Sequence, residues 1–213
     1  TEFSEMFKLP KDAFLSRVKK VTRSLVSLEN LPFPTVVAIN GYALGGGLEV
    51  CMACDYRVLS DRASIGLPEA TLGIIPGFGG TVRLPRITDI STALEWMISG
   101  AIQNAKHALE KGAVDEVAPE SDLRDVALER LSDFSSDIRD YKILRSLKSQ
   151  PIDCDHSTLD QICNTYRDSA DKKPGRNYPA PLTLVETLRS SAKLKRESAQ
   201  ELESEAFYRI AQT

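Results

Sequence analysis

Hydrophobic residues recur at steps of three and four along residues 11–29. The repeat is carried by Leu15, Val18, Val21, Leu25 and Leu28. This spacing places apolar side chains on one face of a helix, so it predicts an amphipathic helix over this segment. Pro32 and Pro34 follow, and prolines end helices because they lack the backbone donor.

A continuous apolar run of mostly β-branched residues occupies positions 35–39. A run without polar alternation is typical of a strand buried on both faces, in a sheet that helices cover. Asn40 and Gly41 then predict a turn, a glycine run leads into a helix near 46–54, and residues 56–59 predict a second strand. Strand, helix and strand within so few residues predict a compact α/β crossover.

Glycine and proline are dense between residues 64 and 86, which predicts a loop-rich stretch. Such density is typical of backbone shaped around a ligand, although a plain surface loop shows it too. Beyond it, the pattern predicts helices at 90–99 and 104–111, a short edge strand at 114–118 and a helix at 120–134.

The pattern changes after about residue 135. Residues 135–177 are polar and weakly periodic, whereas apolar spacing returns from residue 179 and predicts two helices. Their apolar positions are Leu184, Val185, Leu188 and Ala192 on the first, and Leu202, Ala206, Phe207 and Ile210 on the second. We therefore expect an α/β body over 1–134 and a mostly helical extension over 135–213, which either wraps the body or connects to a further part of a larger protein.

The composition narrows the class of protein. The chain has 213 residues, 42% of them hydrophobic, which is enough for a real core in one large domain or one domain with an appendage. The net charge of -3 gives no electrostatic footprint for nucleic acid. The sequence contains no apolar run long enough to predict a membrane span.

Four cysteines raise the question of metal or redox chemistry. Cys51 and Cys54 form a C-x-x-C pair, but they lie in an apolar helical run in which small sulfur side chains simply pack. Cys154 and Cys163 are distant in sequence and nine residues apart, so zinc spacing is absent and we expect no metal site. Reduced thiols fit the cytoplasm of a bacterium or an organellar matrix.

Three consecutive glycines, Gly45, Gly46 and Gly47, open the predicted helix near 46–54. Phosphate cradling of the Walker type would need a lysine that is missing here, and the dinucleotide spacing G-x-G-x-x-G is also absent. An oxyanion hole remains, because a helix N-terminus offers amide donors to developing negative charge. A tight turn required only for packing would show the same glycines.

Two acidic residues follow the glycines. Glu49 lies in an otherwise apolar helix, where an ionised carboxylate is costly unless it is used, although a first-turn glutamate also suits the helix dipole. Glu69 follows Pro68 in a loop and would be an ordinary surface acid by itself. Two carboxylates near one reacting centre can divide the roles of general acid and general base. The two glutamates together, and neither one alone, therefore indicate acid–base catalysis.

Several segments together resemble one known family. They are residues 38–49, 54–57, 65–69, 72–81 and 83–86. They look like the enoyl-CoA hydratase/isomerase (crotonase) superfamily, and the match runs from about residue 32 to about residue 118. Within the superfamily, residues 76–80 and 177–181 look most like the hydratase domain of the bacterial fatty-acid oxidation complex α-subunit.

The resemblance implies a crotonase-like α/β fold (ββα-superhelix) and a role for each matching residue. The backbone N–H of Gly46 supplies half of the oxyanion hole, with Gly45 in the same substrate-binding turn. Glu49 and Glu69 match the two catalytic glutamates of the family. Gly77 matches a loop glycine near the water site.

The resemblance also implies a reaction and partners. The reaction is hydration of 2-trans-enoyl-CoA to 3-hydroxyacyl-CoA, with enoyl-CoA isomerase capability, and it needs no metal or redox cofactor because coenzyme A is part of the substrate. The second oxyanion donor of the family lies upstream of where Thr1 begins, so we expect an N-terminally truncated fragment that lacks the first strands. The expected partners are an absent NAD-dependent dehydrogenase half of the same polypeptide and a thiolase subunit.

Other readings stay open at this point. The chain could perform another crotonase-type acyl-CoA reaction such as thioester hydrolysis, could be an inert docking domain of a multienzyme complex, or could bind a nucleotide at the glycine triplet. His107 and His156 fit solvated positions. The basic run 193–196 fits a solvated helix face better than contact with a CoA phosphate or a partner.

Overall fold

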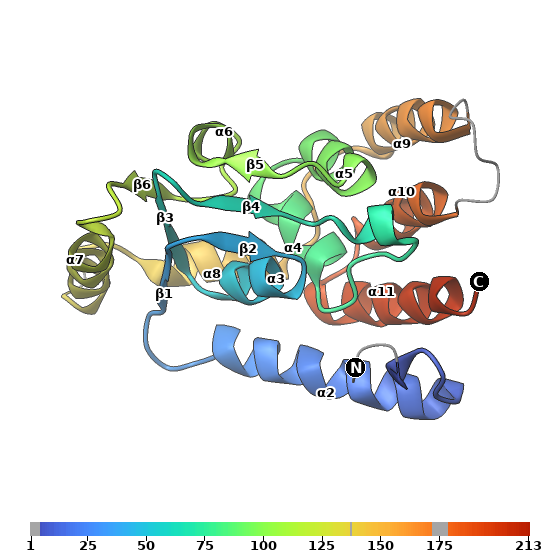
Figure 1. Cartoon of the computed structure of the whole chain (residues 1–213), viewed down its shortest axis with the longest axis horizontal. Coiled ribbons are helices and arrows are strands. Elements are labelled where there is room, and N and C mark those ends of the chain that lie inside the picture. The colour runs from blue at the N-terminus through green and yellow to red at the C-terminus, as the bar shows by residue number, and fades with distance from the viewer. Residues whose placement is uncertain (1–4, 137, 172–178) are drawn as a thin grey trace.

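The computed structural model describes residues 5–136, 138–171 and 179–213, the side chain of Asp171 excepted (Figure 1). Its helices are α2 (Lys11–Glu29), α3 (Gly46–Ala53), α4 (Gly80–Ile87), α5 (Ile90–Ser99), α6 (Ala105–Glu110), α7 (Leu123–Ser135), α8 (Tyr141–Ser149), α9 (His156–Asp171), α10 (Ala180–Ser191), α11 (Arg196–Ala211) and the 3₁₀ helix η1 (Glu69–Leu72). Its strands are β1 (Val36–Ile39), β2 (Tyr42–Leu44), β3 (Tyr56–Ser60), β4 (Ser64–Gly66), β5 (Gln103–Asn104) and β6 (Glu116–Ala118). Positions 177 and 178 of the family resemblance, and the first residues of the chain, lie outside the described part.

The strands form two small sheets. In one, β1, β3 and β6 run parallel in that order; in the other, β2 pairs parallel with β4, and β4 pairs antiparallel with β5. The chain crosses from the first sheet to the second twice, from β1 to β2 and from β3 to β4. Figure 1 shows α3 and α4 beside these strands, with α2 and α11 beyond them. The predicted α/β class with a helical C-terminal part is confirmed.

The predicted doubly buried strand at 35–39 is wrong in one respect. β1 lies at the edge of its sheet, and of its residues only Ile39 is buried. β3, at the centre of the same sheet, is buried along its whole length. Among the described strands, the central one is thus buried and the outer one is not, and the apolar run did not reveal that difference. The predicted edge strand near 114–118 is β6, at the opposite edge.

Helix α2 has the predicted bounds, and Val18 and Leu25 of the predicted apolar stripe are buried, but the buried face is shifted from that stripe. Its buried residues are Phe14, Val18, Thr22, Leu25 and Glu29, whereas Val21 is exposed. Polar groups on the buried face have partners: the Thr22 hydroxyl donates to the Val18 carbonyl, and Glu29 binds two arginines described below. Hydrogen bonds thus compensate the burial of polar residues that a hydrophobicity pattern assigns to solvent.

The stretch predicted to be loop-rich contains three short elements, β4, η1 and α4. β4 exists because it pairs with β2, and α4 begins after Gly79, whose φ of 105° is left-handed. Pro85 lies inside α4. Tertiary pairing and capping stabilise these elements, so glycine and proline density alone did not predict them.

The polar segment 135–177 also contains helices, α8 and α9. Lys148 of α8 is buried, and its ammonium donates to the carbonyls of Met52, Ala53 and Cys54. A cation at a helix C-terminus satisfies carbonyls that lack intrahelical donors. α8 therefore caps α3, the helix that carries Glu49. The turn expected over 172–177 lies outside the described residues.

The C-terminal helices pack on the α/β body. α10 contacts α4, α5, α9 and α11, while α11 contacts α2 and α4. One hydrophobic core joins residues of both parts, from Val18 and Met52 to Leu188 and Phe207. The extension thus wraps the body, and the domain boundary at residue 134 stays a prediction. None of the helices that the structure describes has the length and apolar character needed to cross a bilayer.

Candidate active site

The glycine triplet forms the turn that starts α3. Gly45 has φ 54° and ψ -127°, a left-handed conformation that L side chains rarely adopt, and its amide donates to the carbonyl of Gly66. Gly46 is the first residue of α3, and the first amides of a helix have no intrahelical acceptor. The turn can therefore present amide hydrogens and the positive end of the helix dipole to an anionic oxygen.

Glu49 lies one turn into α3 and is 1% exposed. Its Oε1 accepts hydrogen bonds from the amides of Phe78, at 2.8 Å, and Gly80, at 2.7 Å. Burial raises the pKa of Glu49, while these two amides and the charge of Arg83 act in the opposite direction. The carboxylate is thus held in one orientation by a turn far along the chain.

Glu69 begins η1 and is half-buried. Among the described residues, its Oε2 is one of the few buried side-chain atoms without a hydrogen-bond partner. Burial and, after it, the nearby charge of Glu49 raise the pKa of Glu69 to about 7. A carboxyl group with these properties holds a proton at neutral pH for part of the time, which suits a general acid.

The two carboxylates converge on the glycine turn. A Cβ atom added at Gly45 would lie 2.8 Å from Oε1 of Glu69, and one added at Gly46 would lie 4.0 Å from Oε2 of Glu49. The structure therefore brings Glu49, Glu69, Gly45 and Gly46 to one place.

Gly77 precedes the amides that bind Glu49. A Cβ atom at this position would lie 2.2 Å from the ring of Phe207, so only glycine allows α11 to pack against this turn. The ring of Phe207 also contacts that of Phe78 edge-on, with centroids 6.4 Å apart. Gly77 is thus beside the site through its neighbour Phe78, and close packing is itself a reason for a glycine there.

The sequence interpretation missed a third carboxylate, Glu203 of α11. Its Oε1 accepts from the Gly79 amide at 2.6 Å, and its Oε2 accepts from the Thr81 amide at 2.9 Å and the Thr81 hydroxyl at 2.6 Å. It is fully buried, and burial together with the charge of Glu49 raises its pKa to about 8. A signal existed, because Glu203 precedes Ala206, Phe207 and Ile210 at helical spacing. Leu202, which we placed in that stripe, is 38% exposed.

A buried group of charges supports the same turn from behind. Arg83 donates to both oxygens of Glu29 and to the carbonyl of Phe78. Arg196 also donates to Glu29, at 3.1 Å. Arg196 is buried, so the expectation that the whole basic run 193–196 is a solvated face is wrong for this residue. An arginine next to a buried carboxylate forms strong charge-assisted hydrogen bonds, which explains its burial.

The remaining candidates carry no site. The described residues contain no group of three or more His, Cys, Asp and Glu side chains that could hold a metal ion. Burial raises the pKa of Cys51 to about 11 and also raises that of Cys54, as expected of packed, unreactive thiols. His107 is half-buried beside the Trp96 ring, and His156 is exposed.

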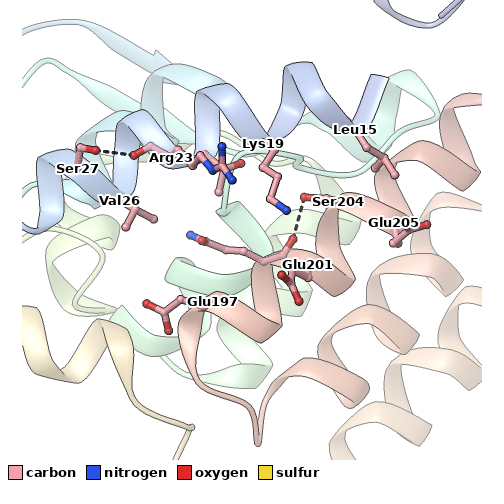
Figure 2. A pocket seen from close by; sticks show the side chains of 11 residues that line it. Leu15, Lys19, Arg23, Val26, Ser27, Glu197, Glu201, Ser204 and Glu205 are labelled. Carbon is pink, nitrogen blue, oxygen red and sulfur yellow. Dashed lines mark hydrogen bonds between the residues drawn. The ribbon is translucent and has the colours of Figure 1, made fainter. Parts of the chain in front are cut away.

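Figure 2 shows the groove between α2 and α11. Lys19 and Arg23 of α2 face it from one wall, and Glu197 and Glu201 of α11 from the other. Neither Glu49 nor Glu69 lines this groove. The candidate site is therefore identified by the carboxylates and the glycine turn, and it lies outside the groove between α2 and α11.

Comparisons with known proteins agree on one family. Residues 2–160 match the family model described as enoyl-CoA hydratase/isomerase. The fatty acid oxidation complex subunit alpha of Pseudomonas savastanoi pv. phaseolicola is 42% identical over 213 residues, and that of Colwellia psychrerythraea is 40% identical over 213 residues. The whole chain is covered in both, and it spans 30% of the length of these relatives.

Solved structures give the same result. The enoyl-CoA hydratase from Bacillus anthracis is 31% identical, with a TM-score of 0.59 over 88% of this chain and 72% of that one. DspI from Pseudomonas aeruginosa is 27% identical, with a TM-score of 0.58 over 77% of this chain and 65% of that one. The expected family resemblance and the crotonase-like fold are confirmed.

Proposed function

This chain belongs to the enoyl-CoA hydratase/isomerase family, and we propose that its site hydrates 2-trans-enoyl-CoA to 3-hydroxyacyl-CoA in fatty-acid β-oxidation. One observation carries the proposal. The carboxylates of Glu49 and Glu69, twenty residues apart in sequence, both lie next to the turn at Gly45 and Gly46, where helix α3 begins. Hydration needs a base, an acid and oxyanion donors around one acyl thioester, and these residues supply those groups.

In the proposed reaction, a water molecule attacks C3 of the enoyl thioester and gives a proton to Glu49. Glu69 delivers a proton to C2, so the elements of water add across the double bond. Negative charge that develops on the thioester oxygen is stabilised by the amide of Gly46. Removing one such donor typically costs about 10²–10³ in rate, or roughly 3–4 kcal/mol of barrier.

The electrostatics of the two glutamates support this division of roles. Burial raises the pKa of Glu49, and the two backbone hydrogen bonds on one of its oxygens oppose that rise and fix the orientation of the carboxylate. Glu69 has an unpartnered buried oxygen and a pKa raised to about 7, which favours its protonated form near neutral pH. Two carboxyl groups whose surroundings differ in this way can act as base and acid.

The same groups could move a double bond. Glu69 would take a proton from one carbon of the acyl chain and return it to another, which is the proposed isomerase reaction. We propose that neither reaction requires a metal or redox cofactor, because proton transfer and oxyanion stabilisation are supplied by side chains and backbone.

The experiment is a spectrophotometric assay with crotonyl-CoA and the complete protein. Hydration removes the conjugated double bond, so the absorbance of the conjugated thioester should fall with time. Absence of any fall at neutral pH, with folded protein, would refute the hydratase proposal. Release of free thiol from the same substrate would instead support thioester hydrolysis.

The wider context is also a proposal, because the chain spans 30% of the relatives' length. Those relatives are alpha subunits of a complex. We propose that the complete protein adds an NAD-dependent dehydrogenase part, associates with a thiolase subunit and works in the bacterial cytoplasm. Co-purification of the complete protein with a thiolase activity would test the partner.

The two other classes of function have less support. A docking role motivated by the C-terminal helices is weakened because α10 and α11 bury their apolar faces in the chain's own core. Binding of free ATP or NAD at the glycine triplet is disfavoured because two carboxylates face that turn and would repel phosphate. Calorimetry with ATP and NAD should therefore show no binding at this turn.

A further inference from the structure

The turn formed by residues 78–81 donates its successive amides alternately to two carboxylates. The first and third amides donate to Oε1 of Glu49 at 2.8 and 2.7 Å. The second and fourth donate to Glu203 at 2.6 and 2.9 Å. One turn is thus clamped between α3 and α11, two helices that are far apart in the sequence.

From this arrangement we infer that Glu203 is a positioning residue of the site, which fixes the turn 78–81 so that its other two amides orient Glu49. The inference rests on the proposed function, since it concerns the base of that reaction. The amides of Gly79 and Gly80 belong to consecutive peptide units that share the Cα atom of Gly79, so a shift of the unit bound by Glu203 also moves the neighbouring unit that binds Glu49.

Packing alone does not account for an acid at this place in α11. Glu203 is fully buried on the stripe formed by Ala206, Phe207 and Ile210, where an apolar side chain would avoid the cost of burying a carboxylate. Three donors, two amides and the Thr81 hydroxyl, compensate that cost. The Glu203 carboxylate therefore binds the turn 78–81 and contributes no apolar packing to the core.

The two carboxyl groups also affect each other electrostatically. Burial and, after it, the charge of Glu49 raise the pKa of Glu203, and the charge of Arg83, which donates to the carbonyl of Phe78, partly opposes the rise that burial causes in the pKa of Glu49. Removing the carboxyl group of Glu203 therefore changes the hydrogen bonds that fix the turn beside the base. Arg83 holds the same turn from its carbonyl side, so the turn does not depend on Glu203 alone for its fold.

The test is steady-state hydration of crotonyl-CoA by the complete protein carrying Glu203→Gln. The amide group keeps one acceptor but places an NH₂ against an amide donor, so the turn must shift. We expect kcat to fall about 10- to 100-fold, as for a misplaced catalytic group, with KM within about threefold of wild type. Glu205→Gln is the matched control, because Glu205 lies on the same helix at the surface, paired with Lys11; it should leave kcat unchanged.

A second measurement separates positioning from general stability. In a Glu49→Gln background, single-turnover rates should be unaffected by Glu203→Gln, because the oriented base is already missing. If Glu203→Gln fails to fold, Thr81→Val replaces it; this variant deletes one hydrogen bond to Glu203 and should lower kcat about 3- to 10-fold.

The outcomes distinguish two failures. A wild-type protein that does not hydrate crotonyl-CoA refutes the proposed function itself. An active wild type whose kcat is unchanged by Glu203→Gln or Thr81→Val refutes the inference about Glu203. An equal loss of rate in the wild-type and Glu49→Gln backgrounds also refutes it, since such a loss indicates a structural role.

Discussion

Oε1 of Glu69 lies 2.8 Å from the position that a Cβ atom would take at Gly45. The same glycine has φ 54°, so its backbone disfavours any larger residue, and a Cβ atom there would displace the Glu69 carboxyl group. The Glu69 carboxyl group therefore packs directly against the turn at the start of α3. The proposed chemistry depends on this contact and on the approach of Glu49 to the same turn at Gly46.

Gly45→Ala should destabilise the protein. The left-handed backbone and the contact with Glu69 together are expected to cost about 1–3 kcal/mol of the free energy of unfolding. Urea denaturation measures the loss. Gly47→Ala is the control, because a Cβ atom there meets nothing within 4 Å and its φ is not left-handed. Equal stabilities for the two variants would contradict the fitted contact.

Glu69→Gln should remove the proposed acid with little change in stability. The buried Oε2 has no hydrogen-bond partner to lose, and an amide avoids burying a charge. We expect turnover of crotonyl-CoA to fall by about 10²–10⁴, as for loss of a general acid. Circular dichroism checks the fold. Turnover near the wild-type value would show that Glu69 is not the proton donor.

Glu49→Gln should likewise preserve the fold and remove the proposed base. Both bonds from the turn, donated by Phe78 and Gly80, go to Oε1, so the amide oxygen of glutamine can still accept them. Turnover is expected to drop by about 10²–10⁴ because a neutral amide cannot take a proton from water. The thermal melt should stay close to that of wild type; a variant that hydrates at normal speed would refute the assignment.

The pH profile of hydration should report Glu69. Its pKa is raised to about 7, and the proposed acid is active when protonated, so kcat/KM should fall as pH rises through about 7. On the acid side, the raised pKa of Glu49 predicts a loss as this base becomes protonated. Rates between pH 5 and 9 at constant ionic strength test both limbs. In Glu69→Gln the limb near pH 7 should vanish, and a flat wild-type profile would oppose the roles.

Glu29→Gln should be strongly destabilising. Glu29 is fully buried and accepts from Arg83 and Arg196, so its neutralisation takes the carboxylate away from the buried Arg83, while Arg196 keeps its pair with Glu197. Loss of one partner of a buried pair costs about 3–5 kcal/mol. Glu120→Gln, which breaks an exposed pair with Arg62, should cost less than about 1 kcal/mol. Chemical denaturation of both variants gives the comparison, and similar losses would contradict the burial argument.

Patterns over a few residues of the sequence predicted individual helices and one turn of this protein. The spacing of apolar residues gave α2 and α5 with the bounds that the structure has, and the glycine triplet gave the start of α3. Glu49 was noticeable because it interrupts an apolar helix. Periodicity and turn chemistry act over a few residues, so a sequence records them directly.

The strand order and the tertiary partners of buried charged residues could not be predicted from the sequence in the same way. The order of the described strands made β1 an edge strand, although its residues are apolar, and ion pairs with Arg83 and Arg196 direct Glu29 of α2 into the protein interior. The helical spacing of Glu203 with the apolar residues of α11 indicates a buried position, but its place against the turn 78–81 is decided only when α11 packs there. A buried carboxylate is stable only when donors surround it, and those donors came from a distant segment.

By itself the sequence determined the helices with strong periodicity, the glycine turn, the two candidate acids Glu49 and Glu69 and the family resemblance. Only the tertiary structure decided that these acids face one turn and that amides of residues 78–81 hold Glu49 in place. The physical reason is that the sequence gives the chemistry of each side chain, whereas the hydrogen-bond partner of a buried polar group depends on which distant elements pack against it.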